Sequence, residues 1–236
     1  MRAVVIIPAL NEESSIGRVL EEIPSQLVSG VVVVDNGSTD QTAKRARALG
    51  ATVVEEPERG YGAACLRGIQ EAERLNADIL VFIDGDYSDF PAQMDRILTP
   101  IRRDGYDLVI GSRMRGNLQP GAMLPQARFG NWLAGTLMRW GWGANFTDLG
   151  PFRAIRYAEY KRLQMADRNY GWTVEMQLKA VEANLKCTEV PVDYRPRIGQ
   201  SKVTGTLSGT LNASVKILRI LGQYWLTKGN RQYPPA

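Results

Sequence analysis

The chain has 236 residues, of which 44% are hydrophobic and 23% are charged, and its formal net charge is +4. This length allows one large α/β domain or two small ones with a proper core, and so mild a charge argues against a dedicated nucleic-acid-binding protein. Histidine is absent. Its absence excludes an imidazole base, a histidine-ligated zinc ion and histidine phosphotransfer, so any chemistry must use carboxylates, arginine, lysine, hydroxyl groups or a hard cation.

The two cysteines, Cys65 and Cys187, lack metal-ligand spacing, which predicts reduced packing residues of a cytoplasmic protein. The N-terminus opens directly into an apolar run, with no pattern of a signal peptide. The best candidate for a membrane span is Leu207–Leu226, but Lys216 and Arg219 interrupt it. It therefore lacks the roughly 18 uninterrupted apolar residues that a span needs.

In the first half of the chain, short β-branched runs alternate with helical patterns. Strands are predicted at Ala3–Pro8, Val31–Asp35, Ala51–Glu55, Asp78–Asp84 and Asp107–Ile110. Helices are predicted between them, near Ser15–Gln26, Thr42–Leu49, Ala63–Leu75 and Ala92–Arg103. This alternation is typical of βαβ units and predicts an α/β fold with a mostly parallel sheet.

The second half is less regular. After a loop at Gly116–Pro125, the predicted elements are a helix at Gln126–Arg139, a strand at Phe152–Ile155, a helix near Trp172–Ala183 and a strand at Cys187–Val192. A basic loop at Arg195–Gly205 then leads to the amphipathic segment Leu207–Leu226, and Lys228–Ala236 is predicted to be a frayed tail. We expect one domain over residues 1–205, followed by a C-terminal helix and tail over residues 206–236.

Polar residues follow the predicted strands, where ligands of such sheets bind. Capping and turn formation explain Asp40 and Ser38, but not Asp35, Asp84 and Asp86 at the ends of apolar strands. The polar segments are Pro8-Ala9-Leu10-Asn11-Glu12-Glu13, Asp35-Asn36-Gly37-Ser38-Thr39-Asp40, Asp84-Gly85-Asp86 and Gly111-Ser112-Arg113.

The pair Asp84 and Asp86 is predicted to bind a metal. If the chain stays extended there, residues two apart face the same way and both carboxylates can meet one ion. Oxygen ligands without histidine or cysteine suit Mg²⁺ or Mn²⁺, which typically share their coordination with substrate phosphates. Such an ion would neutralise a departing diphosphate as a Lewis acid. Turn formation is the alternative role for so short a pattern.

The order of these segments resembles the successive signatures of family 2 glycosyltransferases. The segments beginning at Pro8, Asp35 and Asp84 carry that resemblance, at fitting intervals. Three further segments are similar to the branch of dolichyl-phosphate-mannose and polyprenyl-phosphate-glucose synthases: Gly60-Tyr61-Gly62-Ala63-Ala64, Gly111-Ser112-Arg113 and Asp148-Leu149-Gly150-Pro151-Phe152-Arg153. The resemblance extends from residue 3 to about residue 205.

The resemblance implies a GT-A fold and an inverting transfer of a sugar from a UDP- or GDP-linked donor. Position by position, it implies that the base and ribose are held by Pro8, Ala9, Asn11, Glu12 and Asp35, and the metal by Asp84 and Asp86. It also implies that Arg113 and Arg128 meet an acceptor phosphate and that Asp148 lies beside the acceptor. Relatives often have glutamine where this chain has Ser88, so Ser88, Asp89 or water is expected to complete the metal site.

Two glycine-containing loops have open interpretations. Gly62 either lets a helix pack closely or brings the backbone close to the nucleotide sugar, whereas the missing third small residue disfavours a Rossmann dehydrogenase. The basic loop carries Arg197 and Lys202, whose charges suit phosphate oxygens. Relatives carry a similar Arg-x-Gly-x-Ser-Lys loop over the active site, and a solvated charged loop is the alternative.

The expected acceptor is a polyprenyl phosphate, met at the inner face of a membrane. A phosphate is already ionised near neutral pH, whereas a hydroxyl acceptor needs a base, for which Asp148 is the first choice. The segment Leu207–Leu226, if helical, gathers polar side chains on one narrow stripe and can lie in a bilayer interface. The stripe consists of Asn212, Lys216, Arg219 and Gln223, and the apolar remainder includes Leu211, Val215, Leu218, Leu221 and Trp225.

Alternatives remain at each step. The C-terminal helix can instead pack on its own domain or on a second copy of the chain, and a soluble hydroxyl compound is the alternative acceptor. A sugar nucleotidyltransferase usually has a glycine-rich loop with Arg and Lys after its first strand, which Pro8–Glu13 is not. A non-catalytic sugar-nucleotide-binding protein is disfavoured by the intact Asp84, Asp86 and Asp148.

Overall fold

The computed structural model describes residues 1–199, 207–229 and 231–234. Their centre is a seven-stranded sheet in the order β3-β2-β1-β4-β6-β5-β7. Strand β6 is antiparallel to both of its neighbours, and the other pairs are parallel, which confirms the mostly parallel sheet. The strands are β1 Ala3–Ala9, β2 Gly30–Asp35, β3 Thr52–Glu55, β4 Ile79–Phe82, β5 Leu108–Ser112, β6 Arg153–Arg156 and β7 Cys187–Pro191.

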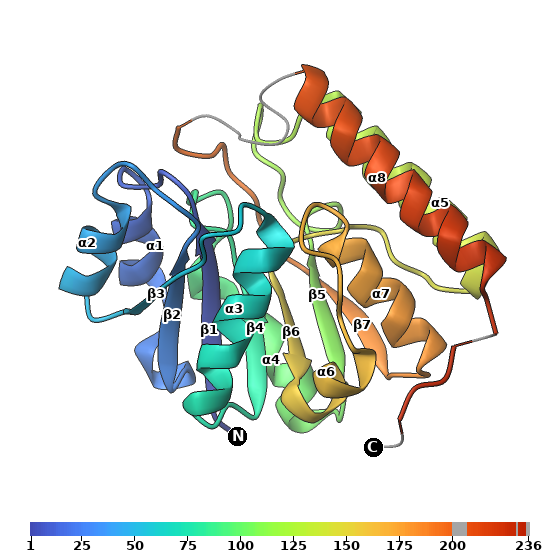
Figure 1. Ribbon diagram of the computed structural model, residues 1–236, viewed down its shortest axis with the longest axis horizontal. Helices are drawn as coiled ribbons and strands as arrows, with labels where there is room; N and C mark the ends of the chain where they lie inside the picture. The colour runs from blue at the N-terminus through green and yellow to red at the C-terminus, as the bar shows by residue number, and fades with distance from the viewer. Residues whose placement is uncertain (200–206, 230, 235–236) are drawn as a thin grey trace.

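Helices cover both faces of this sheet (Figure 1). Alternate side chains of β1 face opposite sides, as the period of a strand requires: Val4 and Ile6 join one buried cluster, and Val5 and Ile7 the other. The first cluster includes residues of α3 Tyr61–Arg74, α5 Pro125–Trp142, α6 Tyr157–Leu163, α7 Trp172–Glu182 and α8 Leu207–Leu226. The second includes residues of α1 Ile16–Glu22, α2 Thr42–Ala48 and α4 Met94–Arg103. Two 3₁₀ turns lie at Ser25–Leu27 and Pro91–Gln93.

The structure corrects several boundaries. The first predicted helix ends at Glu22 because Ile23 precedes Pro24 and is extended, with ψ 122°, as proline demands of the residue before it. Strand β4 ends at Phe82, two residues before Asp84. Helix α6 is an element that the sequence did not predict. It follows β6 directly, so no turn or loop residues mark its start in the sequence.

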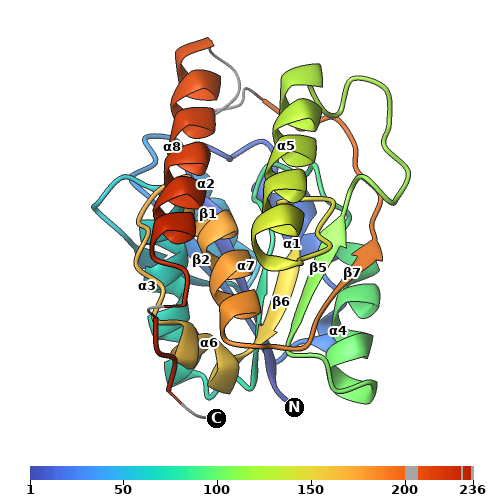
Figure 2. The same cartoon turned by 90° about the vertical axis from the view of Figure 1, so that its right-hand side faces the viewer.

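The C-terminal helix α8 lies side by side with α5 (Figures 1 and 2). Ile220 and Leu221 are buried in the first cluster, and Lys216 forms an ion pair with Asp167 at 2.8 Å. Leu221, which was predicted to lie on the apolar side of a helix at a bilayer interface, thus packs in the domain instead, and Lys216 of the polar stripe pairs within the protein. Leu211 and Asn212 lie outside the residues whose side chains are described. No helix in the described ranges is long and apolar enough to cross a membrane.

The tail after α8 folds back on the domain. Arg231 donates to both carboxylate oxygens of Glu182, at 2.9 and 2.8 Å, and the Tyr233 hydroxyl donates to the same carboxylate at 2.9 Å. The Arg162 guanidinium donates to the carbonyl oxygen of Pro234 at 2.7 Å. The prediction of a frayed tail is thus wrong for residues 231–234, because Glu182 on α7 supplies a buried acceptor that the local sequence does not reveal.

The N-terminus lies at one edge of the sheet, and the carboxyl ends of the parallel strands lie at the other (Figure 1). The amino ends of α5 and α8 extend past this carboxyl edge (Figure 2). The polar segments after β1, β2, β4 and β5 therefore gather where two long helices overhang the sheet.

Candidate active site

A pocket of about 250 Å³ opens at the carboxyl edge of the sheet. We call it the edge pocket. Its walls come from the ends of β1, β2 and β4, the start of α3, the segment before α7 and the loop after β7. The lining residues are Pro8, Ala9, Leu10, Glu12, Asn36, Arg59, Gly60, Tyr61, Ala64, Asp84, Gly85, Asp86, Asn169, Tyr170 and Arg197. The structure thus brings together segments that are far apart in the sequence.

Asp84 and Asp86 both line the edge pocket, as predicted from the sequence. Burial and the neighbouring Asp86 carboxylate raise the pKa of Asp84 to about 7. Asp86 is buried, and its carboxylate accepts the backbone N–H of Ser88 at 2.9 Å. Ser88 thus holds Asp86 in place, through a turn that the extended-chain argument did not foresee.

The same region contains a third buried carboxylate, Asp89. Neither of its oxygens has a hydrogen-bond partner among the described residues, and burial, followed by the charge of Asp84, raises its pKa well above the ordinary value. Crowded, partly unpaired carboxylates fit a divalent cation, whose charge would offset their repulsion. No group of three or more His, Cys, Asp or Glu side chains in the described chain is arranged to hold an ion by itself.

Arg197 pairs with two acids of the edge pocket. Its guanidinium lies 3.1 Å from Asp86 and 3.0 Å from Glu12. Glu12, on the other side, accepts the hydroxyl of Ser15 at 2.9 Å. Arg197 lies in the wall of the edge pocket, and its role in binding the donor stays a prediction. Lys202, from the same loop, lies outside the described residues.

Arg195 anchors the loop that carries Arg197. Its guanidinium lies 3.3 Å from the Tyr87 ring centre, donates to the Tyr87 carbonyl at 2.7 Å and pairs with Glu22 at 2.8 Å. The Arg195 guanidinium is therefore paired with groups of the protein itself. Arg195 thus anchors the basic loop, while Arg197 lies in the wall of the edge pocket.

Arg113 and Asp148 form a closed pair beside this region. The Arg113 backbone N–H and Nε donate to Oδ2 of Asp148, both at 2.8 Å, and Nη2 donates to Oδ1 at 2.7 Å. Asp148 is only 1% exposed. Burial would lower the pKa of Arg113, but the Asp148 carboxylate raises it well above its ordinary value. The guanidinium also lies over the ring of Tyr194, 4.9 Å from its centre.

Of the residues expected to hold a nucleotide, Pro8, Ala9 and Glu12 line the edge pocket. Asn11 instead accepts the N–H of Thr39 at 2.8 Å and so ties the β1 and β2 loops together. Asp35 is buried next to Ala9 on the neighbouring strand. Its carboxylate accepts the N–H of Ser38 at 2.8 Å, which gives it at least a turn-forming role.

Of the two roles considered for Gly62, close helix packing and approach to the nucleotide sugar, the structure shows the packing role. A side chain there would come within 2.1 Å of the Asp167 carbonyl oxygen, and one at Gly60 within 2.1 Å of the Arg168 carbonyl oxygen. Gly62 is not among the pocket-lining residues, whereas Gly60 is. The missing side chain of Gly62 lets α3 pack against the backbone before α7, and its assignment to nucleotide binding stays a prediction. Arg128 is exposed on the first turn of α5, outside the pocket wall.

Several pocket residues were missed by the sequence reasoning. Asn36 belongs to a recognised motif, and its amide donates to the carbonyl oxygens of Glu56 and Glu58 at 2.8 and 2.7 Å, so the motif was a usable signal. Tyr61 also lay within a quoted segment. Asn169 and Tyr170 belong to no motif, and only the folded chain brings them into the wall of the edge pocket.

The chain is similar to known proteins along most of its length. A model of glycosyl transferase family 2 matches residues 4–163. An uncharacterized glycosyltransferase of Mycobacterium tuberculosis is 34% identical over 92% of this chain and 96% of its own. An undecaprenyl-phosphate mannosyltransferase of Micrococcus luteus is 31% identical over 89% of this chain and 90% of its own.

The structure is similar to glucosyl-3-phosphoglycerate synthase from Mycobacterium tuberculosis in complex with Mn²⁺, uridine diphosphate and glucosyl-3-phosphoglycerate. The TM-score is 0.76 and the identity 25%, over 94% of this chain and 79% of that one. This likeness confirms the predicted GT-A architecture. The chain belongs to glycosyltransferase family 2.

Proposed function

We propose that this enzyme transfers a sugar, with inversion, from a nucleoside-diphosphate sugar to polyprenyl phosphate. The observation that carries the proposal is the closed pair of Arg113 and Asp148. Both oxygens of Asp148 accept hydrogen bonds from Arg113, so this carboxylate is poorly placed to take a proton from a hydroxyl acceptor. A phosphate acceptor needs no such base, and a guanidinium held in place suits its oxygens. The similarity to the undecaprenyl-phosphate mannosyltransferase of Micrococcus luteus supports a polyprenyl phosphate as the acceptor.

The donor is proposed to bind in the edge pocket with Mg²⁺ or Mn²⁺ held by Asp84 and Asp86. When bound, the metal supplies charge neutralisation at the departing diphosphate. The Mn²⁺ and uridine diphosphate in the similar synthase structure support this arrangement. Arg197 is placed to meet diphosphate oxygens once it releases Asp86.

Asp35 is proposed to bind the nucleotide rather than the sugar. Asp35→Ala should weaken the binding of free nucleoside diphosphate about tenfold, because a hydrogen bond to a charged group is lost. Asp35→Asn keeps an oxygen that can accept the N–H of Ser38, so it separates the turn from the nucleotide contact. Isothermal titration calorimetry checks both variants. Unchanged affinity in Asp35→Ala would show that Asp35 only shapes the turn.

The membrane part of the proposal comes from the distribution of charge. Residues 108–147 and 194–236 contain none of the 25 acidic residues of the chain but eleven of its 29 basic ones. These two stretches include α5 and α8, which lie side by side. An acid-free pair of helices with exposed Arg128, Arg139 and Arg219 suits an anionic lipid surface.

Exposed aromatic and aliphatic side chains lie on the same two helices. On α5, Phe129, Trp132 and Trp140 are 59%, 60% and 79% exposed. On α8, Val215, Leu218 and Trp225 are 56%, 44% and 50% exposed. Tryptophan and arginine together are typical of segments that lie in a bilayer interface. Since every side chain assigned here to the reaction precedes residue 205, the division into a catalytic part, 1–205, and a membrane-contacting helix and tail, 206–236, is kept as a proposal.

A vesicle-binding experiment tests the membrane contact. Trp132→Ser combined with Trp140→Ser should weaken co-sedimentation with phosphatidylglycerol vesicles about tenfold, because two large exposed apolar side chains are removed. Leu49→Ser is the matched control. It removes a 47% exposed apolar side chain next to α2, at the far side of the molecule from α5 and α8 (Figure 1). Equal binding by all three proteins, or none by the wild type, would contradict the membrane contact.

An acceptor assay tests the reaction itself. UDP- and GDP-sugars are offered with undecaprenyl phosphate, dolichyl phosphate or phosphoglyceric acid, and the glycosylated product is measured. We expect product on a polyprenyl phosphate. Transfer only to phosphoglyceric acid, the soluble acceptor class of the similar synthase, would replace the polyprenyl part of the proposal. No turnover of any donor would overturn the catalytic assignment.

A further inference from the structure

Glu189 lies beneath the loop that carries Asp148. It belongs to β7, is 8% exposed, and takes no part in the edge pocket. Its Oε1 accepts the backbone N–H groups of Thr147 and Asp148, at 2.8 and 3.1 Å. Its Oε2 accepts the Thr147 hydroxyl at 2.7 Å. One carboxylate therefore holds two consecutive backbone groups and the side chain between them.

These contacts continue to Arg113 by two routes. The Thr147 hydroxyl also lies 2.7 Å from the hydroxyl of Ser112, the residue before Arg113. Asp148, whose N–H is held by Glu189, binds Arg113 through three hydrogen bonds. The position of the Arg113 guanidinium thus depends on the loop at Thr147 and Asp148, whose backbone N–H groups are held by Glu189.

We propose that Glu189 is a positioning residue, which acts through Thr147 and Asp148 to hold the Arg113 guanidinium toward the acceptor. The role of Arg113 at the acceptor rests on the proposed function, whereas its placement by Glu189 does not. A carboxylate is well suited to this task, because it can accept from two N–H groups and a hydroxyl at once. A positional error of about 1 Å in such a group can cost about 100-fold in rate.

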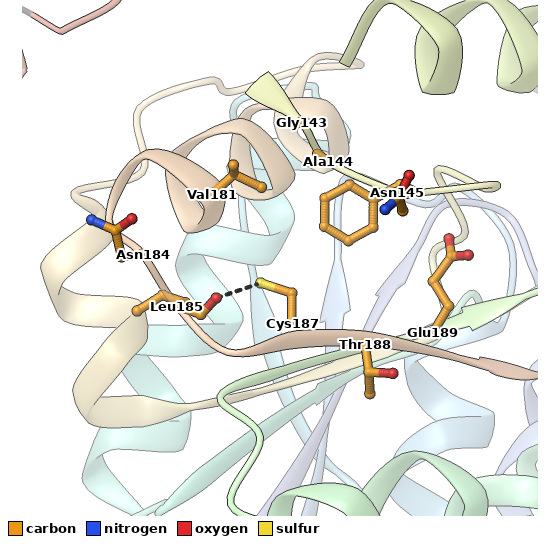
Figure 3. A pocket seen from close by; sticks show the side chains of 10 residues that line it. Gly143, Ala144, Asn145, Val181, Asn184, Leu185, Cys187, Thr188 and Glu189 are labelled. Carbon is orange, nitrogen blue, oxygen red and sulfur yellow. Dashed lines mark hydrogen bonds between the residues drawn. The ribbon is translucent and has the colours of Figure 1, made fainter. Parts of the chain in front are cut away.

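The surroundings of Glu189 suit a positioning role. Three donors converge on its two carboxylate oxygens, and burial raises its pKa, partly offset by those hydrogen bonds. Glu189 also borders an open pocket of about 400 Å³, with Asn145 and Cys187 in its wall (Figure 3). Because this space is open, truncating Glu189 enlarges an existing pocket and leaves no closed cavity in the core.

The kinetic test compares Glu189→Ala with Glu189→Gln in the full-length chain. Glu189→Ala should lower kcat for transfer to polyprenyl phosphate about 100-fold, while the affinity for nucleoside diphosphate stays within about twofold. Glu189→Gln should recover most of this loss, because its amide oxygen can still accept the N–H groups of Thr147 and Asp148. A loss of kcat in Glu189→Ala together with an equal loss of nucleotide affinity would overturn the role.

Glu182→Ala is the matched control for lost stability. Glu182 is also a largely buried carboxylate with several donors, namely Trp142, Arg231 and Tyr233, but it has no contact with the Asp148 loop. Thermal unfolding places the two alanine variants on one stability scale. If Glu189→Ala and Glu182→Ala lose the same stability and also the same kcat, the positioning role of Glu189 is overturned.

A measurement without turnover keeps the two proposals separate. The Nε–H of Arg113, which donates to Asp148, should give a protected nitrogen-15 NMR signal, assigned by its disappearance in Arg113→Lys. The signal should be lost or shifted in Glu189→Ala and retained in Glu189→Gln and Glu182→Ala. An unchanged signal in Glu189→Ala overturns the role of Glu189. If the wild type transfers no sugar to polyprenyl phosphate, the proposed function fails, and this NMR comparison still decides the placement of Arg113.

Discussion

Asp84→Ala and Asp86→Ala should each lower sugar transfer at least about 1000-fold, because both remove a carboxylate proposed to hold the metal at the leaving diphosphate. The fold should survive, since these acids crowd one another: burial and Asp86 raise the pKa of Asp84. Steady-state kinetics with Mn²⁺, Mg²⁺ and excess chelator measure the effect, and calorimetry measures Mn²⁺ binding. Asp95→Ala removes an acid on α4, whose carboxylate accepts from Thr99 in the same helix, and should leave turnover unchanged. Full activity in excess chelator would refute the metal requirement.

Metal binding should also strengthen as pH rises through about 7. The pKa of Asp84 is raised to about 7 in the metal-free protein, and binding to its carboxylate requires loss of the proton. Mn²⁺ affinity should therefore be about tenfold higher at pH 8 than at pH 6. In Asp84→Asn this pH dependence should disappear. An Asp84→Asn variant with the wild-type slope would assign the proton to another group.

Arg113→Leu should lower kcat/KM for polyprenyl phosphate by about 100-fold to 1000-fold, because a fixed guanidinium at the acceptor phosphate is lost. The substitution leaves the buried Asp148 carboxylate without its partner, which is expected to cost about 3–5 kcal/mol of stability. A second variant separates the two effects. Arg113→Leu with Asp148→Asn removes the stranded charge, so stability should recover.

Activity in that double variant should remain low, because the guanidinium is still missing. Acceptor kinetics and thermal unfolding of the two variants provide the comparison, and calorimetry with nucleoside diphosphate checks that the edge pocket is intact. Recovery of transfer together with stability would mean that Arg113 serves only the fold. Wild-type nucleotide affinity with lost transfer would support its place at the acceptor.

The sequence was most informative about the candidate site residues that directly follow predicted strands. The apolar runs before Asp84 and Asp35 predicted their strands, and the position at the carboxyl edge follows from parallel pairing. The direction of β6 was not predictable, because an apolar run has no sign that distinguishes parallel from antiparallel pairing. Helix α6 and the contacts of Arg231 were missed because both depend on neighbours distant in the chain.

The site followed the same division. The carboxylates Asp84 and Asp86 stand two residues apart and could be recognised locally. The contact of Arg197 with Glu12 joins residues 185 positions apart. The sequence also cannot show that Gly62 faces the backbone of Asp167 and Arg168, because these residues are far from it in the chain. Long-range pairing, which no local pattern encodes, decides which polar groups are free to act and which are used inside the protein.

The segment that presents Asp148 is built around the buried side chain of Arg153. Its guanidinium donates to the carbonyl oxygens of Gly150, Leu149 and Thr173, at distances of 2.6 to 3.0 Å, and burial lowers its pKa to about 10. An interior cation that satisfies the carbonyls of a loop fixes the loop before any ligand arrives. In the proposed reaction, acceptor binding would then require little ordering of this segment, because the entropic cost of ordering it is met when the protein folds.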